Sequence, residues 1–286
     1  MSDDEIARRK ALTFEQAEGL APPPRQLARS EMSNELRAVL WNFVHGQIQG
    51  CVHNGHVDPE PWFSVLEAVH VYKYHLPIDE FQSRATSVME TVKHVIMNGS
   101  HAEVYGWLQF VMQHLRDAAF SNRIDGILSY CRAPYRVVEG FVIFPVASEQ
   151  DAVTLNAAFN ELHKSGLTGA REHLKSAAAH LTNGLFADSV RESIHAVESV
   201  AKVMEPSADL SKTLAKLENS AKIHGGLKKG FLSIYGYTSD EKGIRHALID
   251  DANANVDETD ALFMIGACAA FVSYLINKSR AAGLLK

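Results

Sequence analysis

The run ALFMIGACAAFVSYLI, residues 261–276, is the feature that most constrains the fold. It is apolar nearly all round, and a helix without a polar face must be buried against other elements. Asp257, Glu258 and Asp260 precede it and complement the positive end of a helix, so the helix is expected to begin near Asp257. The run predicts a helical bundle whose last helix lies either in the core of the monomer or in a homodimer interface.

The same run is expected to stay out of the membrane. Ala261–Ile276 is shorter than the roughly 20 apolar residues that cross a bilayer, and Ser273 interrupts it. The N-terminal sequence MSDDEIARRK begins with acids and lacks the apolar stretch of a signal peptide. We expect a soluble, cytoplasmic protein that makes no contact with a membrane.

The overall charge argues against bulk binding to nucleic acid. The 286 residues are 46% hydrophobic and 22% charged, as in a globular protein long enough for two domains. Their formal net charge is −6, whereas a protein that coats DNA needs a basic face. No bulk DNA binding is expected, although an enzyme that acts at one phosphate needs only a small basic pocket.

The cysteines indicate neither a disulfide framework nor a thiolate metal site. Cys51, Cys131 and Cys268 are scattered without a C-x-x-C pair, which fits a reducing cytosol. Cys51 has His53 and His56 as neighbours in a segment rich in Gly, Asn and Pro, and a loop of this kind can gather metal ligands. Solvated loop histidines are the better explanation, because no second cluster with ligand spacing follows, so we expect no metal and no cofactor.

Helical spacing covers most of the chain. The N-terminal arm contains the triple proline Pro22–Pro24, which excludes helix there. Ser33 and Ser148 are predicted N-caps, and Asp79 and Glu80 are predicted to open a helix. The first half predicts a helix after Ser33 and further helices at roughly 60–76, 78–98, 102–119 and 122–131.

One segment is β-like. Residues 134–147, PYRVVEGFVIFPVA, hold two runs of aromatic and β-branched residues around Glu139-Gly140, which predicts a short hairpin. The chain is therefore predicted to be all-α, with two helical domains joined by this hairpin. Residues 1–133 form the N-terminal helical domain with its extended arm, and residues 148–286 form the second helical bundle.

A helix at roughly 187–204 carries a polar stripe. Ser189 and Glu192 have the spacing of a capping box, and an apolar seam includes Val190, Ile194, Val197, Ala201 and Met204. About 100° away, Arg191, His195, Glu198 and Lys202 share one face. Two interpretations are open. The stripe lines a functional cleft, or it is a solvated helix face stabilised by side-chain pairs one helical turn apart.

The densest polar chemistry lies in YGYTSDEKGIRHAL, residues 235–248. Thr238, Ser239 and Asp240 favour turns, so a shaped loop is predicted, with Ser239 and Asp240 supporting it. Arg245 can clamp a phosphate and His246 can move a proton near neutral pH, a pairing that suits phosphodiester cleavage. Alternatively, Arg245 pairs with a nearby acid and the loop is structural.

The second half of the chain resembles a known family. The run from Leu174 to Tyr274, including DSVRESIHAVESVAK and GFLSIYGYTSDEKGIRHAL, is similar to the C-terminal HEPN-type helical domain of AbiJ-like abortive infection proteins of bacteria. Residues 10–43 are similar to the start of an N-terminal domain found in front of it. The resemblance implies a dimeric, all-helical HEPN bundle in an antiviral defence context, in which related toxins cut RNA.

The resemblance also implies a catalytic set. HEPN ribonucleases typically have four to six residues between an Arg and a His, whereas Arg245 and His246 are adjacent here and Arg191 and His195 have only three residues between them. The candidate catalytic residues are Arg245, His246, Arg191, His195 and Glu198. In the implied metal-independent mechanism, the ribose 2′-OH attacks the adjacent phosphate, His246 transfers a proton and Arg245 stabilises charge.

Two functions stay open from the sequence. The first is a metal-independent endoribonuclease of phage defence with an RNA substrate. The second is a catalytically silent helical dimerisation or interaction module, acting as a sensor or antitoxin-like partner. In both, a homodimer is expected through residues 148–286.

Overall fold

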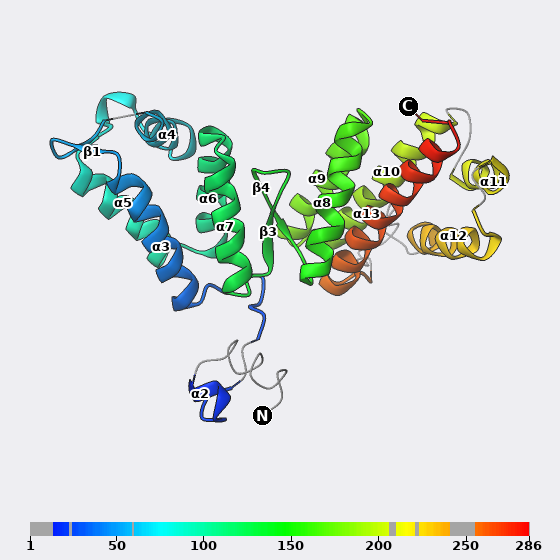
Figure 1. The fold of residues 1–286 in the computed structure, drawn as a ribbon, viewed down its shortest axis with the longest axis horizontal. Coiled ribbons are helices and arrows are strands. Elements are labelled where there is room, and N and C mark those ends of the chain that lie inside the picture. Colours follow the sequence, from blue (N-terminus) through cyan, green and yellow to red (C-terminus); the bar gives the residue numbers. More distant parts are fainter. Residues whose placement is uncertain are drawn as a thin grey trace. The chain divides into compact units, whose positions relative to one another are not determined.

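The computed structural model describes residues 14–22, 25–58, 60–205, 210–220, 223–240 and 255–285, without the side chains of Ser239 and Asp240. This part of the chain is mostly helical and contains two short antiparallel strand pairs (Figure 1). The predicted all-α class is confirmed.

The chain divides into two compact units. Unit 1 comprises residues 1–111 and 123–134, and unit 2 comprises residues 112–122 and 135–286. This division places the strand pair at 135–145 within unit 2. The predicted domain limits at 133/134 and 147/148 stay predictions.

The first half of the chain contains the following elements in order: α2 (Phe14–Ala17), α3 (Asn34–Gln49), β1 (Val52–His53), β2 (His56–Val57), α4 (Trp62–Ala68), the π-helix η1 (Val69–Lys73), the 3₁₀ turn η2 (Ile78–Glu80), α5 (Ala85–Asn98), α6 (His101–Leu115) and α7 (Ala118–Tyr130).

Helices α3 and α5 pack through seams with a four-residue repeat. Leu36, Leu40, Val44 and Ile48 of α3 are fully buried, and each such side chain contributes about 1.5–3 kcal/mol relative to full exposure. Ser33 accepts a hydrogen bond from the Leu36 backbone amide, which confirms the predicted cap.

The predicted start of α5 is wrong. Asp79 and Glu80 lie in the single turn η2, and α5 begins only at Ala85. The intervening backbone pairs with the β1–β2 hairpin instead, because the Val57 amide donates to the Ser83 carbonyl at 2.8 Å. A helix through Ser83 would break this pairing.

The predicted hairpin at 134–147 is present as strands β3 (Tyr135–Val138) and β4 (Val142–Pro145), paired Tyr135↔Pro145 and Val138↔Val142. Glu139 and Gly140 both have positive φ, 53° and 78°, as a tight turn requires. Phe144 is fully buried in the core of unit 2. The role of the β3–β4 hairpin as a linker between two domains stays a prediction.

Unit 2 continues with α8 (Glu149–Lys164), α9 (Thr168–Thr182), α10 (Phe186–Met204), α11 (Leu210–Ser220), α12 (Gly225–Asp240) and α13 (Glu258–Ala281). Helix α10 packs most extensively against α9 and α13, and α8 lies on the other side of α13 (Figure 1). The predicted cap Ser148 and the predicted start of the last helix near Asp257 are confirmed, and Asp257 also forms a capping box with Asp260.

Two local predictions in unit 2 are wrong. Helix α10 begins at Phe186, so Ser189 is a buried interior residue and forms no capping box with Glu192. Residues 235–240 are the last turns of α12 and are not a loop. Thr238 is fully buried and donates to the Tyr235 carbonyl at 2.7 Å, which satisfies its hydroxyl inside the helix.

Helix α13 has 24 residues, so it exceeds the apolar run read from the sequence. Among the described helices it is the one long and apolar enough to cross a membrane by length and composition, with a mean hydropathy of 1.7 over a window that is 50% buried. A core helix passes the same test, so the predicted absence of membrane contact stays a prediction.

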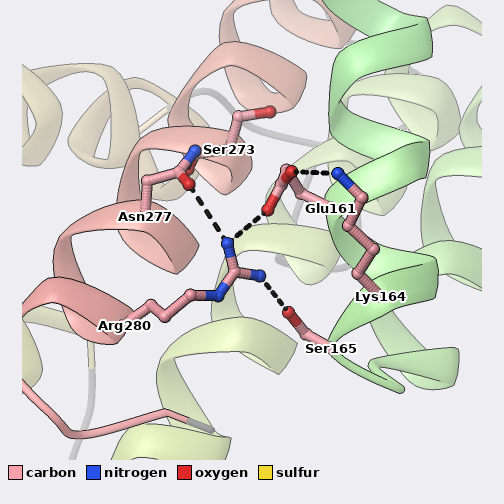
Figure 2. A network of polar contacts seen from close by, with 6 residues as sticks. All are labelled: Glu161, Lys164, Ser165, Ser273, Asn277 and Arg280. Carbon is pink, nitrogen blue, oxygen red and sulfur yellow. Dashed lines mark hydrogen bonds and ion pairs between the residues drawn. The ribbon is translucent and has the colours of Figure 1, made fainter.

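The C-terminal turn of α13 is hydrogen-bonded to the C-terminal end of α8. Figure 2 shows the Arg280 guanidinium donating to Glu161 at 2.7 Å and to Ser165 at 3.0 Å. The hydrogen bond from Arg280 holds the pKa of Glu161 below its ordinary value, against the opposing effect of burial. Lys164 also contacts Glu161, at 3.2 Å.

The three cysteines are free and differ in burial. Cys51 is partly exposed, whereas Cys131 and Cys268 are buried. Burial raises the pKa of the Cys131 thiol to about 11 and that of Cys268 to about 12.

Candidate functional site

Helix α10 separates apolar and polar side chains as the sequence predicts. Val190, Ile194 and Val197 are buried on the core side, which confirms the seam. The stripe residues all keep part of their surface in solvent: Arg191, His195, Glu198 and Lys202.

A histidine pair joined by one carboxylate lies at the middle of this stripe. His173 Nδ1 of α9 is 2.7 Å from Glu192 Oε2, and His195 Nδ1 is 3.5 Å from the other oxygen of the same carboxylate. The two rings meet edge to face with centroids 5.3 Å apart. Glu192 therefore contacts both imidazoles through Nδ1 and does not use the Nε2 atom of either ring.

Close packing of α9 on α10 brings His173 to the stripe. Leu174 and Ala177 are buried beside it, which fixes the face that α9 presents. At Gly169, one turn earlier, an added Cβ would lie only 3.0 Å from Ser199 Oγ of α10. Glycine at this position therefore permits the short helix-to-helix distance that the cluster needs.

The surroundings of Glu192 keep its carboxylate ionised. Burial alone would raise the pKa of Glu192, but the hydrogen bond from His173 and the charges of His173 and His195 outweigh it and hold the pKa below its ordinary value. The Glu192 side chain is 18% exposed. An ionised carboxylate therefore lies between the two imidazoles.

An open pocket of about 440 Å³ lies against this cluster. His173, His195, Glu198 and Lys202 line it, together with Ser199 and Val203. Tyr235 of α12 donates its hydroxyl to Glu198 at 2.8 Å. The pocket thus combines two imidazoles, one ammonium group and one carboxylate, and it is accessible to solvent.

The structure brings together some of the predicted site residues and leaves others apart. His195 and Glu198 share the pocket, together with Lys202. Arg191 forms an ion pair with Asp188, one turn earlier on the same helix, and does not line the pocket. Arg245 and His246 lie outside the described residues. The structure describes the backbone of Ser239 and Asp240 at the end of α12 but not their side chains.

Sequence reasoning missed His173 and misassigned Glu192. Glu192 and His195 are three residues apart on one helix, a signal that the sequence contains. His173 joins them only through the packing of α9 on α10, which no local pattern reveals.

The histidines near Cys51 differ from this cluster. His53 and His56 lie on β1 and β2, and His56 Nδ1 is 3.2 Å from Ser83 Oγ. Across the described ranges, one group of three His, Cys, Asp or Glu side chains has ligand atoms within 4.8 Å of one another: His173, Glu192 and His195.

Unit 1 contains a pocket of another kind. It has a volume of about 280 Å³ and is lined mainly by apolar side chains beside η1, including Val69, Phe81 and Trp107. Trp107 is fully buried, and its Nε1 has no hydrogen-bond partner in the part of the chain that the structure describes. Burial and the charge of Glu103 raise the pKa of Tyr74, at the edge of this pocket, to about 12.

Comparison with known proteins gives no relative from which a function could be transferred. No family model matches the chain, and neither a curated protein nor a solved structure matches it. The chemistry of the pocket against α9 and α10 is therefore the main guide to function.

Proposed function

We propose that this chain is a metal-independent endoribonuclease of bacterial phage defence that cleaves RNA in the pocket beside α9 and α10. The observation that carries the proposal is the pair of imidazoles held through Nδ1 by a single carboxylate, Glu192. Cleavage of an RNA phosphodiester needs one group that accepts a proton and another that donates one, and two imidazoles supply both.

The proposed reaction starts at the ribose 2′-OH. One imidazole, through Nε2, takes the 2′-OH proton as the 2′ oxygen forms a bond to phosphorus. The other imidazole gives a proton to the departing 5′ oxygen as the P–O5′ bond breaks. The products are a 2′,3′-cyclic phosphate and a 5′-OH end, and the two imidazoles have exchanged protonation states.

The surroundings of the pair support this chemistry. Glu192 stabilises whichever imidazole is charged and fixes both ring orientations through Nδ1. Lys202 lines the same pocket and supplies positive charge for the phosphate as negative charge develops on it. His195 is one of the residues expected to be catalytic from the sequence, and His173 takes the role of second proton carrier.

Residues 241–254 form a separate part of the proposal. Arg245 is proposed to clamp the phosphate with its planar guanidinium, and His246 is proposed to assist proton transfer. Lysine at position 245 would keep the charge but lose the two-pronged grip, so Arg245→Lys and His246→Ala test this part. Cleavage at the wild-type rate in both variants would remove residues 245 and 246 from the mechanism and leave the α9–α10 pair intact.

The cellular context of the proposal comes from the resemblance to AbiJ-like proteins. The proposal further includes a cytoplasmic homodimer assembled through residues 148–286. The apolar character of α13 does not by itself require a dimer, because Met264, Cys268 and Val272 are buried within the same chain. Light scattering at tens of micromolar measures the mass, and a monomer mass would exclude the dimer.

A second candidate function is the catalytically silent interaction module. The ion pair between Arg191 and Asp188 favours it, because a stripe residue held by its neighbour is typical of an ordinary solvated helix face. This alternative requires that no RNA be cut.

The deciding experiment is incubation of the purified full-length chain with tRNA and with total RNA, with and without a chelator. Cleavage that persists with chelator, yields 2′,3′-cyclic phosphate ends and disappears in His195→Ala and His173→Ala supports the proposal. His163→Ala is the matched control, because His163 is an exposed histidine of α8 that does not line the pocket. Intact RNA with the wild-type protein, or equal cleavage by all variants, would contradict the proposal.

A further inference from the structure

We propose that His173, Glu192 and His195 form a binding site for a divalent transition-metal ion of the Zn²⁺ type. The ligand atoms of these three side chains all lie within 4.8 Å of one another. Two imidazoles and one carboxylate match the donor set of zinc sites that keep a fourth position open. Hard cations such as Mg²⁺ and Ca²⁺ prefer oxygen ligands, so a set with two nitrogens selects against them.

The two contacts to the Glu192 carboxylate are close to the separations expected between ligand atoms in tetrahedral coordination. Bonds of about 2.0–2.2 Å at tetrahedral angles place neighbouring ligand atoms about 3.3 Å apart. The observed separations from the Glu192 oxygens are 2.7 Å to His173 and 3.5 Å to His195, on either side of that value. An ion can therefore replace the two contacts with Glu192 with only small side-chain movements.

The supporting helices hold the ligands in place and leave them accessible. Glu192 and His195 lie one turn apart on α10, and His173 comes from α9, which packs closely on it. The side chains of His173 and His195 are 37% and 31% exposed, so an ion can enter from solvent. The adjoining pocket of about 440 Å³ provides room for water or another ligand at the fourth position.

Nearby charges add little to this donor set. Glu198 and Lys202 line the same pocket with opposite charges. Arg191 forms an ion pair with Asp188, and the carboxylate of Glu192 is the anionic ligand of the three.

The bound ion regulates the proposed reaction. An imidazole that gives the lone pair of Nδ1 to a metal carries its remaining proton on Nε2 and cannot accept another there. Occupancy by Zn²⁺ therefore stops both imidazoles from exchanging protons and inhibits RNA cleavage. This inhibition rests on the proposed function, whereas the binding of the metal does not.

Metal binding is tested on the full chain after treatment with chelator, with ZnCl₂ titrated in competition with a chromophoric chelator. We expect one strong equivalent in the wild type and a visible absorption spectrum typical of tetrahedral coordination when Co²⁺ replaces Zn²⁺. Loss of a group that merely orients a ligand costs about 10- to 100-fold in metal affinity. His173→Ala, His195→Ala and Glu192→Gln, which each remove a ligand, should therefore weaken binding at least about 100-fold.

Controls separate this site from other histidines. His163→Ala and the double variant Cys51→Ala/His53→Ala should bind Zn²⁺ as tightly as the wild type. Circular dichroism before titration verifies folding, and Glu192→Gln keeps the side-chain shape if an alanine variant unfolds. Absence of a strong equivalent in the wild type, or unchanged affinity in all three site variants, would overturn the proposal.

The activity measurement gives an independent answer. If the metal-free chain cuts RNA and Zn²⁺ at one equivalent inhibits it, both proposals stand. If the metal-free chain does not cut RNA, the proposed function fails, and the binding titration alone decides the metal site.

Discussion

The pocket of unit 1 and the pocket of unit 2 are built from opposite kinds of side chain. The first is lined mainly by apolar residues, and one of them, Trp107, is fully buried. The second is open and lined by His173, His195, Glu198 and Lys202. In unit 1 the Trp107 Nε1 and Tyr74 hydroxyl atoms are buried, whereas in unit 2 the two imidazoles reach solvent.

The polar atoms of the unit 1 pocket mainly affect stability, whereas those of the unit 2 pocket are available for chemistry. The Trp107 Nε1 and Tyr74 hydroxyl atoms are buried without a hydrogen-bond partner among the described residues, which lowers stability and exposes nothing to a substrate. The two histidines are half exposed and connected by a carboxylate, an arrangement that adds little stability but positions proton carriers. Substitutions should therefore affect stability in one pocket and activity in the other.

The largest effect is expected for His195→Ala. Removal of a general acid or base typically lowers the rate about 10²- to 10⁴-fold. The side chain is 31% exposed, so the free energy of unfolding should change by less than about 1 kcal/mol. RNA cleavage assays with urea unfolding measure both quantities. A large loss of stability in this variant would break the contrast between the pockets.

The next effect is a loss of stability in Trp107→Ala. Truncation of a fully buried tryptophan typically costs about 3–5 kcal/mol, because a cavity remains. Urea unfolding followed by circular dichroism gives the value. Trp107→Phe should cost less, because it keeps most of the volume and removes the N–H group that lacks a partner. Equal losses in the two variants would show that the indole N–H is satisfied.

A smaller effect with a defined pH dependence is expected for Glu161→Gln, at the network of Figure 2. The native-state pKa of Glu161 is lowered from that of a free carboxyl, about 4.3. Its ion pair with Arg280 therefore stabilises the fold fully above that pH, and the contribution is lost as the pH falls through the lower native-state value.

The substitution should cost about 1 kcal/mol at pH 7, discounted because the Arg280 side chain is 37% exposed. Thermal melting of wild type and variant between pH 7 and pH 3 measures it. A difference in melting temperature that does not shrink toward pH 3 would contradict the assignment. RNA cleavage should be unchanged, since this polar network lies outside the pocket of unit 2.

The smallest effect is expected for Tyr235→Phe. The substitution removes the hydroxyl that donates to Glu198 at 2.8 Å and should cost about 0.5–1 kcal/mol. Urea unfolding at low salt measures the change. If cleavage falls by more than tenfold while stability is nearly unchanged, the Tyr235 hydroxyl belongs to the reactive site and is not only a support for Glu198.

The sequence predicted what depends on local spacing. The caps at Ser33 and Ser148 follow from short side chains that accept backbone hydrogen bonds, and the start of α13 follows from the acids at Asp257 and Glu258. The course of α10 follows from its apolar period, and His195 was placed on the polar face where it lies.

What depends on tertiary contacts could not be predicted. Thr238 is a residue type that favours turns, yet it is helical here, with its side chain buried and its hydroxyl bonded to the Tyr235 carbonyl of the same helix. Glu192 matches a capping box, but it contacts His173, which is 19 residues away in the chain. The sequence predicts His195 as a site residue but not His173, because His173 comes from another helix.

The unequal burial of the cysteines gives the chain a built-in set of chemical reporters. Cys51 is partly exposed and should react first with a thiol reagent, whereas Cys131 and Cys268 become reactive only when their surroundings open. Cys131 belongs to unit 1 and Cys268 to unit 2. Timed alkylation followed by peptide mass analysis therefore compares the opening rates of the two units within one native molecule, without any substitution.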